Sequence, residues 1–179
     1  PAVNGVIEEN VVVKGRFFLG ENAIIKAGTR IEGNAWIGAN ATIGPNAFLR
    51  GNTVIEEEAI IGNATEVKSS VVMRGSHAAH LSYIGDSVIC ENVNLGAGTK
   101  LANLRFDEKN VEIELNGKKV DSGRRKLGCM IGAGTRTGVN ASINCGVLIG
   151  KNCFVYPNAF VKKNLESNTV LKENSHRVD

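Results

Sequence analysis

Aromatic residues and prolines are scarce in this sequence of 179 residues, of which 5% are aromatic and only 3 are proline. A β-sandwich of this length normally uses more aromatic side chains to fill its core, so the core here must be built from Ile, Val, Leu and Ala. No apolar run approaches the roughly 18 residues of a membrane-spanning helix, and the first residues do not have the pattern of a signal peptide. We expect one folded domain that spans no membrane.

The cysteines and the overall charge point away from metal and nucleic acid. The four cysteines contain no C-x-x-C pair, so we expect reduced thiols in a cytoplasmic protein and no metal site. The formal net charge is only +3, and no run of Lys and Arg is interleaved with aromatic residues, which argues against a nucleic-acid partner. This charge is compatible with an anionic small-molecule ligand.

Aliphatic residues recur at every sixth position. From Ile7 onward, twelve successive positions carry Ile, Val, Leu or Met, namely Ile7, Val13, Leu19, Ile25, Ile31, Ile37, Ile43, Leu49, Ile55, Ile61, Val67 and Met73. Gly and Asn, which accept tight turns, fill many of the positions between them. The same spacing returns late in the chain, at Ile131, Thr137, Ile143, Ile149, Val155 and Val161.

A period of six residues fits neither a helix nor a sandwich. In a helix it would place successive apolar residues on different faces, and an alternation of period two persists only briefly. It fits a coil of three hexads, in which each hexad is a short strand and a turn and the coils stack about 4.8 Å apart. The pattern resembles the hexapeptide-repeat family, and the resemblance implies an all-β fold, the left-handed parallel β-helix.

The spacing of six is interrupted twice. The first interruption runs from Met73 to Ile84 and contains His77 and His80. The second is an excursion over about residues 105–126, where apolar and charged residues alternate and Asn116-Gly117 predicts the turn of a β-hairpin. Interruptions of a repeat leave the coil as loops, so we expect function to lie there.

The residues in and after the first interruption resemble a known family of enzymes. Residues 80–86 (HLSYIGD) and 92–99 (NVNLGAGT) are similar to the acetyltransferase half of the bifunctional N-acetylglucosamine-1-phosphate uridylyltransferase/glucosamine-1-phosphate acetyltransferase family. Residues 102–107 and the long hairpin resemble the archaeal branch of the bifunctional sugar-1-phosphate nucleotidylyltransferase/acetyltransferases. The resemblance covers essentially the whole chain. It implies transfer of an acetyl group from acetyl-CoA to an amino-sugar 1-phosphate, in the synthesis of UDP-N-acetylhexosamines.

The resemblance implies a catalytic or sugar-binding role for several positions. His80 matches the general base, for which an imidazole with a pKa of about 6.5 is well suited at neutral pH, and Asn103 matches an amide that orients the reacting groups. Sugar and phosphate contacts are implied for Arg50, Lys68, Tyr83, Asn94 and Lys109. Arg50 and Lys68 are eighteen residues apart, one full coil, so they should stack on one face.

The acetyl-CoA half of the site is less completely matched. Ala97 matches a position whose backbone N–H serves the acetyl carbonyl, which would stabilise a developing oxyanion. We assign Arg124 and Arg125, in the basic run 124–126, to the phosphates of coenzyme A. The bacterial branch has a Ser after the glycine that matches Gly138, whereas this chain has Val139. The C-terminal helical arm of that branch is also missing.

The domain organisation follows from the same reading. Residues 1–179 form one acetyltransferase domain, with a polar tail over about residues 164–179 that includes His176. A nucleotidylyltransferase domain is expected to lie outside this chain. The family also implies a homotrimer with the substrates between adjacent β-helices.

Two other functions compete with acetyl transfer. The chain could be a catalytically silent module that only trimerises a nucleotidylyltransferase. A trimeric carbonic anhydrase of the same fold would need three His around a metal, and here only His77 and His80 fall in the coil region, with the wrong spacing. We take His77 as structural. Glucosamine 1-phosphate and galactosamine 1-phosphate both remain candidate acceptors, because they differ in the configuration of one hydroxyl.

Overall fold

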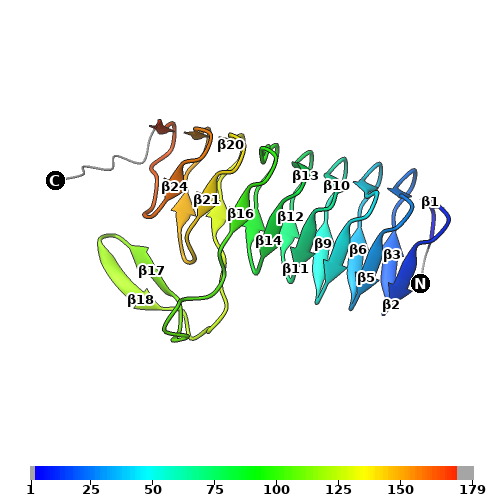
Figure 1. Cartoon of the computed structure of the whole chain (residues 1–179), viewed down its shortest axis with the longest axis horizontal. Coiled ribbons are helices and arrows are strands. Elements are labelled where there is room, and N and C mark those ends of the chain that lie inside the picture. Colours follow the sequence, from blue (N-terminus) through cyan, green and yellow to red (C-terminus); the bar gives the residue numbers. More distant parts are fainter. Residues whose placement is uncertain (1–2, 173–179) are drawn as a thin grey trace.

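The protein is an elongated parallel β-helix, described here from a computed structural model over residues 3–172 (Figure 1). Each turn of the coil contributes one short strand to each of three faces, and each strand pairs in parallel with the strands one coil away. Successive coils are stacked along the long axis of the molecule. No helix capable of crossing a membrane occurs in the described part of the chain.

The first face consists of two sheets on one side of the stack. Its strands are β1 (Val6–Ile7), β4 (Ile24–Ile25), β7 (Thr42–Ile43), β10 (Ile60–Asn63) and β13 (His77–His80), followed by β20 (Arg136–Thr137), β23 (Phe154–Val155) and β25 (Val170–Leu171). Asn94 joins the two sheets, because it forms parallel bridges to both His77 and Arg136.

The second and third faces are continuous sheets. The second contains β2 (Val12–Lys14), β5 (Arg30–Glu32), β8 (Phe48–Arg50), β11 (Glu66–Lys68), β14 (Tyr83–Gly85), β16 (Lys100–Leu101), β21 (Ser142–Ile143) and β24 (Phe160–Val161). The third contains β3 (Phe17–Leu19), β6 (Ala35–Ile37), β9 (Thr53–Ile55), β12 (Val71–Val72), β15 (Val88–Ile89), β19 (Met130–Ile131) and β22 (Leu148–Ile149).

The core is the column of aliphatic side chains predicted from the period of six. Every predicted position from Leu19 to Val67 is fully buried, as are the late positions from Ile131 to Val161. Small residues such as Ala23, Ala41 and Ala59 fill the corners, also buried. The turns use the expected residues, since most non-glycine residues with positive φ are Asn.

The predicted interruption from Met73 to Ile84 is wrong. After Val67 the chain takes a step of five residues, so Val72 points inward and Met73 does not. Ala78 then takes the next inward position and the coil continues to Ile84, with β13 paired to β10. His77 and His80 therefore lie on a strand of the coil rather than in a loop. A second step of five residues leads from Ile84 to Ile89.

The predicted hairpin is confirmed. Strands β17 (Glu112–Leu115) and β18 (Lys118–Asp121) pair antiparallel around Asn116 and Gly117, both with positive φ. The excursion leaves the coil after β16 and returns before β19, between the second and third faces. It folds back on the coil: Val111 is buried, and the Asn164 side chain donates a hydrogen bond to the Glu114 carbonyl at 2.8 Å.

The coil extends further than the predicted start of the polar tail at residue 164. Leu165 and Leu171 pack against the core, and β25 pairs with β23. These two leucines supply the apolar side chains of a further coil. The prediction of a polar tail from residue 164 did not take them into account. His176 lies outside the described residues.

Candidate active site

The two predicted phosphate ligands stack on the second face. Arg50 ends β8 and Lys68 ends β11, and the two residues are direct partners in the parallel pairing. Side chains two residues apart on a strand share a face, so Phe48 and Glu66 point outward beside them. The one-coil separation predicted from the sequence is confirmed.

Each of these cations is paired with a carboxylate that the sequence reading did not assign. Arg50 Nε lies 2.6 Å from Glu66 Oε1, and Lys68 Nζ lies 2.7 and 2.6 Å from the two carboxylate oxygens of Asp86. The hydrogen bond with Glu66 raises the pKa of Arg50 more than desolvation lowers it. Both acids could have been found from the sequence. Glu66 is two residues before Lys68 and so shares its strand face, and Asp86 directly follows the strand of Tyr83.

Tyr83 and Asn103 join the same cluster. The Asn103 side-chain amide donates to the Tyr83 hydroxyl at 3.1 Å and to Asp86 Oδ2 at 2.5 Å. Burial raises the pKa of the Tyr83 phenol above its ordinary value, and the negative charge of Glu66 adds to this effect. The phenol therefore remains a neutral hydrogen-bond donor at physiological pH. We refer to Arg50, Glu66, Lys68, Tyr83, Asp86 and Asn103 as the second-face cluster.

His80 lies at the corner where the first face meets the second. It ends β13, three residues before Tyr83, and it is exposed. Within residues 3–172 its imidazole makes no hydrogen bond or ion pair to another side chain. The following residue, Leu81, is exposed and has a φ of 51°, a left-handed conformation that leucine rarely adopts. The equivalent corner residues of the neighbouring coils, Ala64 and Gly98, are also left-handed, so this conformation belongs to the turn of the coil.

Ala97 occupies the same corner one coil further along. The neighbouring Gly98 N–H donates to the His80 carbonyl at 3.2 Å, and the Ala97 carbonyl accepts from Asn140 N–H at 2.8 Å. The Ala97 N–H itself has no acceptor within the described residues. The next residue of this corner column is Val139, which is exposed and provides no hydroxyl.

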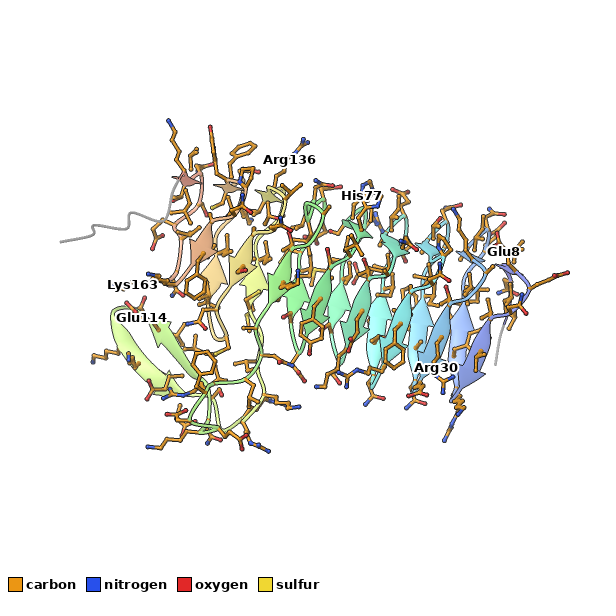
Figure 2. All side chains as sticks on the ribbon, in the orientation of Figure 1. Glu8, Arg30, His77, Glu114, Arg136 and Lys163 are labelled. Atoms are coloured by element: carbon orange, nitrogen blue, oxygen red, sulfur yellow. The ribbon has the colours of Figure 1, made fainter. Side chains whose placement is uncertain are left out.

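Four predicted residues lie apart from both the second-face cluster and the corner of His80 and Ala97. Asn94 is on the first face, bridged to His77, which Figure 2 labels. The other three are on the excursion and exposed: Lys109, Arg124 and Arg125. Arg125 is paired with Glu108, and the Lys109 N–H donates to Asp107 Oδ1 at 3.3 Å. The structure of the single chain does not bring these four residues together with the second-face cluster.

A family model covers the part of the chain that carries this geometry. The model described as "GMPPB C-terminal domain" matches residues 31–122, a span that includes the second-face cluster, the corner of His80 and Ala97, and the hairpin. The chain belongs to this family.

Two relatives of this chain are named as bifunctional proteins. The chain is 52% identical over 161 residues to a "bifunctional sugar-1-phosphate nucleotidylyltransferase/acetyltransferase" of Sulfurisphaera tokodaii, covering 90% of this chain and 40% of the relative. It is 45% identical over 169 residues to a "bifunctional protein GlmU" of Methanocaldococcus jannaschii, covering 94% of this chain and 41% of the relative. The chain thus spans about two fifths of the length of these relatives.

Two solved structures share the fold of this chain. A UDP-N-acetylglucosamine acyltransferase from Campylobacter jejuni superposes with a TM-score of 0.52 at 16% identity, covering 94% of this chain and 72% of that one. A polySia-specific acetyltransferase, NeuO, also gives 0.52 at 14% identity, covering 98% and 81%. This likeness supports the prediction of a left-handed parallel β-helix.

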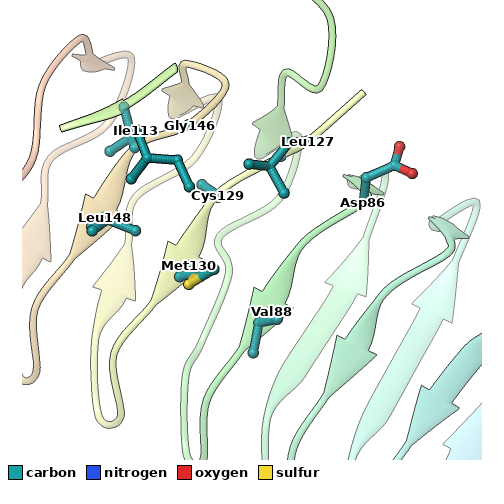
Figure 3. A pocket seen from close by; sticks show the side chains of 10 residues that line it. Asp86, Val88, Ile113, Leu127, Cys129, Met130, Gly146 and Leu148 are labelled. Carbon is teal, nitrogen blue, oxygen red and sulfur yellow. The ribbon is translucent and has the colours of Figure 1, made fainter. Parts of the chain in front are cut away.

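A small apolar cavity lies between the hairpin and the third face, with Asp86 at one edge (Figure 3). Ile113 of β17 faces Val88, Met130 and Leu148 of the third face across it, with Leu127 at its edge. Its walls carry almost no polar atoms, so the cavity suits packing of the hairpin rather than binding of a sugar phosphate. Asp86 lies at its rim with the carboxylate turned away.

Proposed function

We propose that this chain is an acetyl-CoA-dependent N-acetyltransferase acting on an amino-sugar 1-phosphate. The observation that carries the proposal is the stack of Arg50 on Lys68 beside Tyr83 and Asn103, one corner away from His80 and Ala97. Two cations at one end of a cluster suit a phosphate, and a phenol and an amide beside them suit the hydroxyls of a sugar ring.

In this proposal each group has one task. His80 accepts a proton from the sugar amine while the amine nitrogen attacks the thioester carbonyl of acetyl-CoA. The Ala97 N–H donates to the carbonyl oxygen as it becomes negative. The C–N bond forms, the C–S bond breaks, and the proton held by His80 leaves with coenzyme A as its thiol. Asn103 orients the amine, and Asn94 holds the sugar.

The positions that lie apart fit the proposal if a second copy completes the site. His80, Asn94 and Lys109 are all exposed, so a neighbouring β-helix in a homotrimer can cover them. In the proposal Lys109 contacts the sugar phosphate, and Arg124 and Arg125 bind the phosphates of coenzyme A. Sedimentation equilibrium tests this assembly, and a stable monomer with full activity would contradict it.

The test of activity is thiol release from acetyl-CoA in the presence of glucosamine 1-phosphate or galactosamine 1-phosphate. We expect His80→Ala to lower the rate by about 10²–10⁴-fold while the circular dichroism spectrum is retained. His77→Ala is the matched control, because it removes an imidazole from the same strand, and it should remain active. If the well-folded wild-type chain released no thiol with either sugar, the silent trimerisation module would become the better function.

A further inference from the structure

Asp86 is held in place by the coils on both sides of it. Its N–H donates to the Lys68 carbonyl at 2.8 Å, and its carbonyl accepts from the Gly128 N–H at 2.8 Å. Its φ of 48° is left-handed, a conformation that Asp accepts more readily than most residues. Next to Asp86, the Leu127 N–H donates a hydrogen bond to the Asn103 carbonyl at 3.1 Å. This bond joins the two ends of the excursion.

The carboxylate of Asp86 is the meeting point of two side chains. It accepts from Lys68 Nζ at 2.6 and 2.7 Å and from Asn103 Nδ2 at 2.5 Å. The Lys68 and Asp86 side chains are only 15% and 17% exposed, whereas those of Arg50 and Glu66 are 38% and 32% exposed. The Lys68–Asp86 pair is therefore less screened by water than its neighbour.

An ionised carboxylate only accepts hydrogen bonds, whereas a primary amide both donates and accepts. Asp86 consequently requires the NH₂ end of Asn103 to face it, which directs the Asn103 carbonyl oxygen elsewhere. The same NH₂ group donates to the Tyr83 oxygen, so the Tyr83 proton points to a different acceptor. One negative charge thus sets the polarity of the two groups that would meet the sugar.

Lysine has a long flexible side chain that loses rotamer freedom when it binds an anion. Asp86 holds the Lys68 ammonium through one or two of the three N–H donors of that group. Part of the rotamer entropy of Lys68 is therefore already lost before a phosphate binds. At least one donor of Lys68 remains for a phosphate oxygen. Asp86 thus favours both the binding of a phosphate by Lys68 and the orientation of the Asn103 amide. Its own negative charge near the phosphate opposes this effect.

We propose that Asp86 is a positioning residue that fixes the Lys68 ammonium and the Asn103 amide relative to each other. Its effect on turnover rests on the proposed acetyl transfer, but its effect on Lys68 does not. Asp86→Asn is the informative variant, because Asn is nearly the same size and occupies most of the other left-handed non-glycine positions in this chain. Glu57→Gln is the control, since it also removes a carboxylate from an ion pair, with Arg74, at a distant corner.

The first measurement is the kinetics of acetyl transfer. We expect Asp86→Asn to lower kcat/KM for the amino-sugar phosphate by about ten- to hundredfold, the usual effect of a lost charge-assisted hydrogen bond. Part of this loss should appear in kcat, because Asn103 is no longer oriented. Glu57→Gln should behave as wild type. A lower KM at unchanged kcat would overturn the proposal, since Asp86 would then only compete with the phosphate for Lys68.

The second measurement needs no activity. Lys68 in each protein is labelled with limiting acetic anhydride and quantified by mass spectrometry of the peptide that contains it. Lys68 should react severalfold faster in Asp86→Asn than in wild type or Glu57→Gln, because its ammonium is no longer paired. Equal labelling would overturn the proposal even if turnover falls. Faster labelling in a chain without acetyl transfer would uphold the positioning of Lys68 while contradicting the proposed function.

Discussion

The Tyr83 hydroxyl occupies the space beside Gly85 that a side chain would need. A Cβ placed on Gly85 would lie 2.6 Å from the hydroxyl oxygen. The same Cβ would lie 2.7 Å from Asn103 Nδ2. Gly85 is the partner of Lys68 in the next coil, and its missing side chain creates the space in which Tyr83 and Asn103 meet. Both contacts are tighter than real Cβ contacts allow.

Gly85→Ala should therefore displace Tyr83 and Asn103 without unfolding the coil. We expect kcat/KM for acetyl transfer to fall by about tenfold or more, because misplacement of groups at a site by small distances is costly. The melting temperature, measured by circular dichroism, should change little, because side chains rather than backbone must move. An alanine variant with full activity would contradict the assignment of this cluster to substrate binding.

Arg50→Met should raise KM for the sugar phosphate by about tenfold or more while changing kcat less. In the proposed site the guanidinium of Arg50 binds the phosphate, a group that does not itself react. Arg30→Met is the matched control, because Arg30 lies on the same face one coil earlier and is also paired with a glutamate. Steady-state kinetics with the amino sugar varied checks both variants. Equal KM values would remove Arg50 from the phosphate site.

Tyr83 should ionise above the ordinary phenol pKa of about 10, because burial raises its pKa. A group whose pKa is raised on folding contributes stability that is present below its unfolded pKa and is lost as the pH rises through its folded value. The chain has 2 tyrosines, so the difference in absorbance at 295 nm between wild type and Tyr83→Phe isolates this ionisation. A midpoint below 10 would show that the phenol is more exposed than described.

Thr53→Val should stabilise the protein. Within the described residues, the buried Thr53 hydroxyl has no hydrogen-bond partner, and replacing an unsatisfied hydroxyl by a methyl group should gain about 1 kcal/mol. Thr65→Val is the contrasting variant, because the Thr65 hydroxyl donates to the Ala78 carbonyl at 3.0 Å and its loss should be destabilising. Calorimetric melting should move upward for the first variant and downward for the second. The same direction for both would contradict the assignment.

The core was predictable wherever the inward positions kept a constant step of six residues. From Leu19 to Val67 the period of six selects Ile25 rather than the adjacent Ile24 and Ile61 rather than Ile60, and the structure follows it. After Val67 the sequence offers both Val72 and Met73, and counting by six selects the wrong one. The shorter step is a property of the corner between the second and third faces, where Ser69 and Ser70 turn the chain, and a periodic pattern carries no information about it.

The site was predictable in its parts more than in its assembly. The spacing of eighteen residues is a geometric quantity, so the stacking of Arg50 on Lys68 followed from the sequence. The resemblance supplied roles for Asn94 and Lys109 but no positions, and they lie on other surfaces. Asp86 was visible in the quoted motif, yet its importance comes from contacts with Lys68 and Asn103, which are separated from it by about one coil in either direction.

The excursion leaves the coil after β16 and returns before β19, yet Leu101 and Ile131 keep their places against Ile143 and Ile149. The ladder above and below is thus closed without help from the inserted arm. A change in the length of the hairpin between Leu115 and Lys118 therefore requires no shift in the register of the neighbouring coil strands.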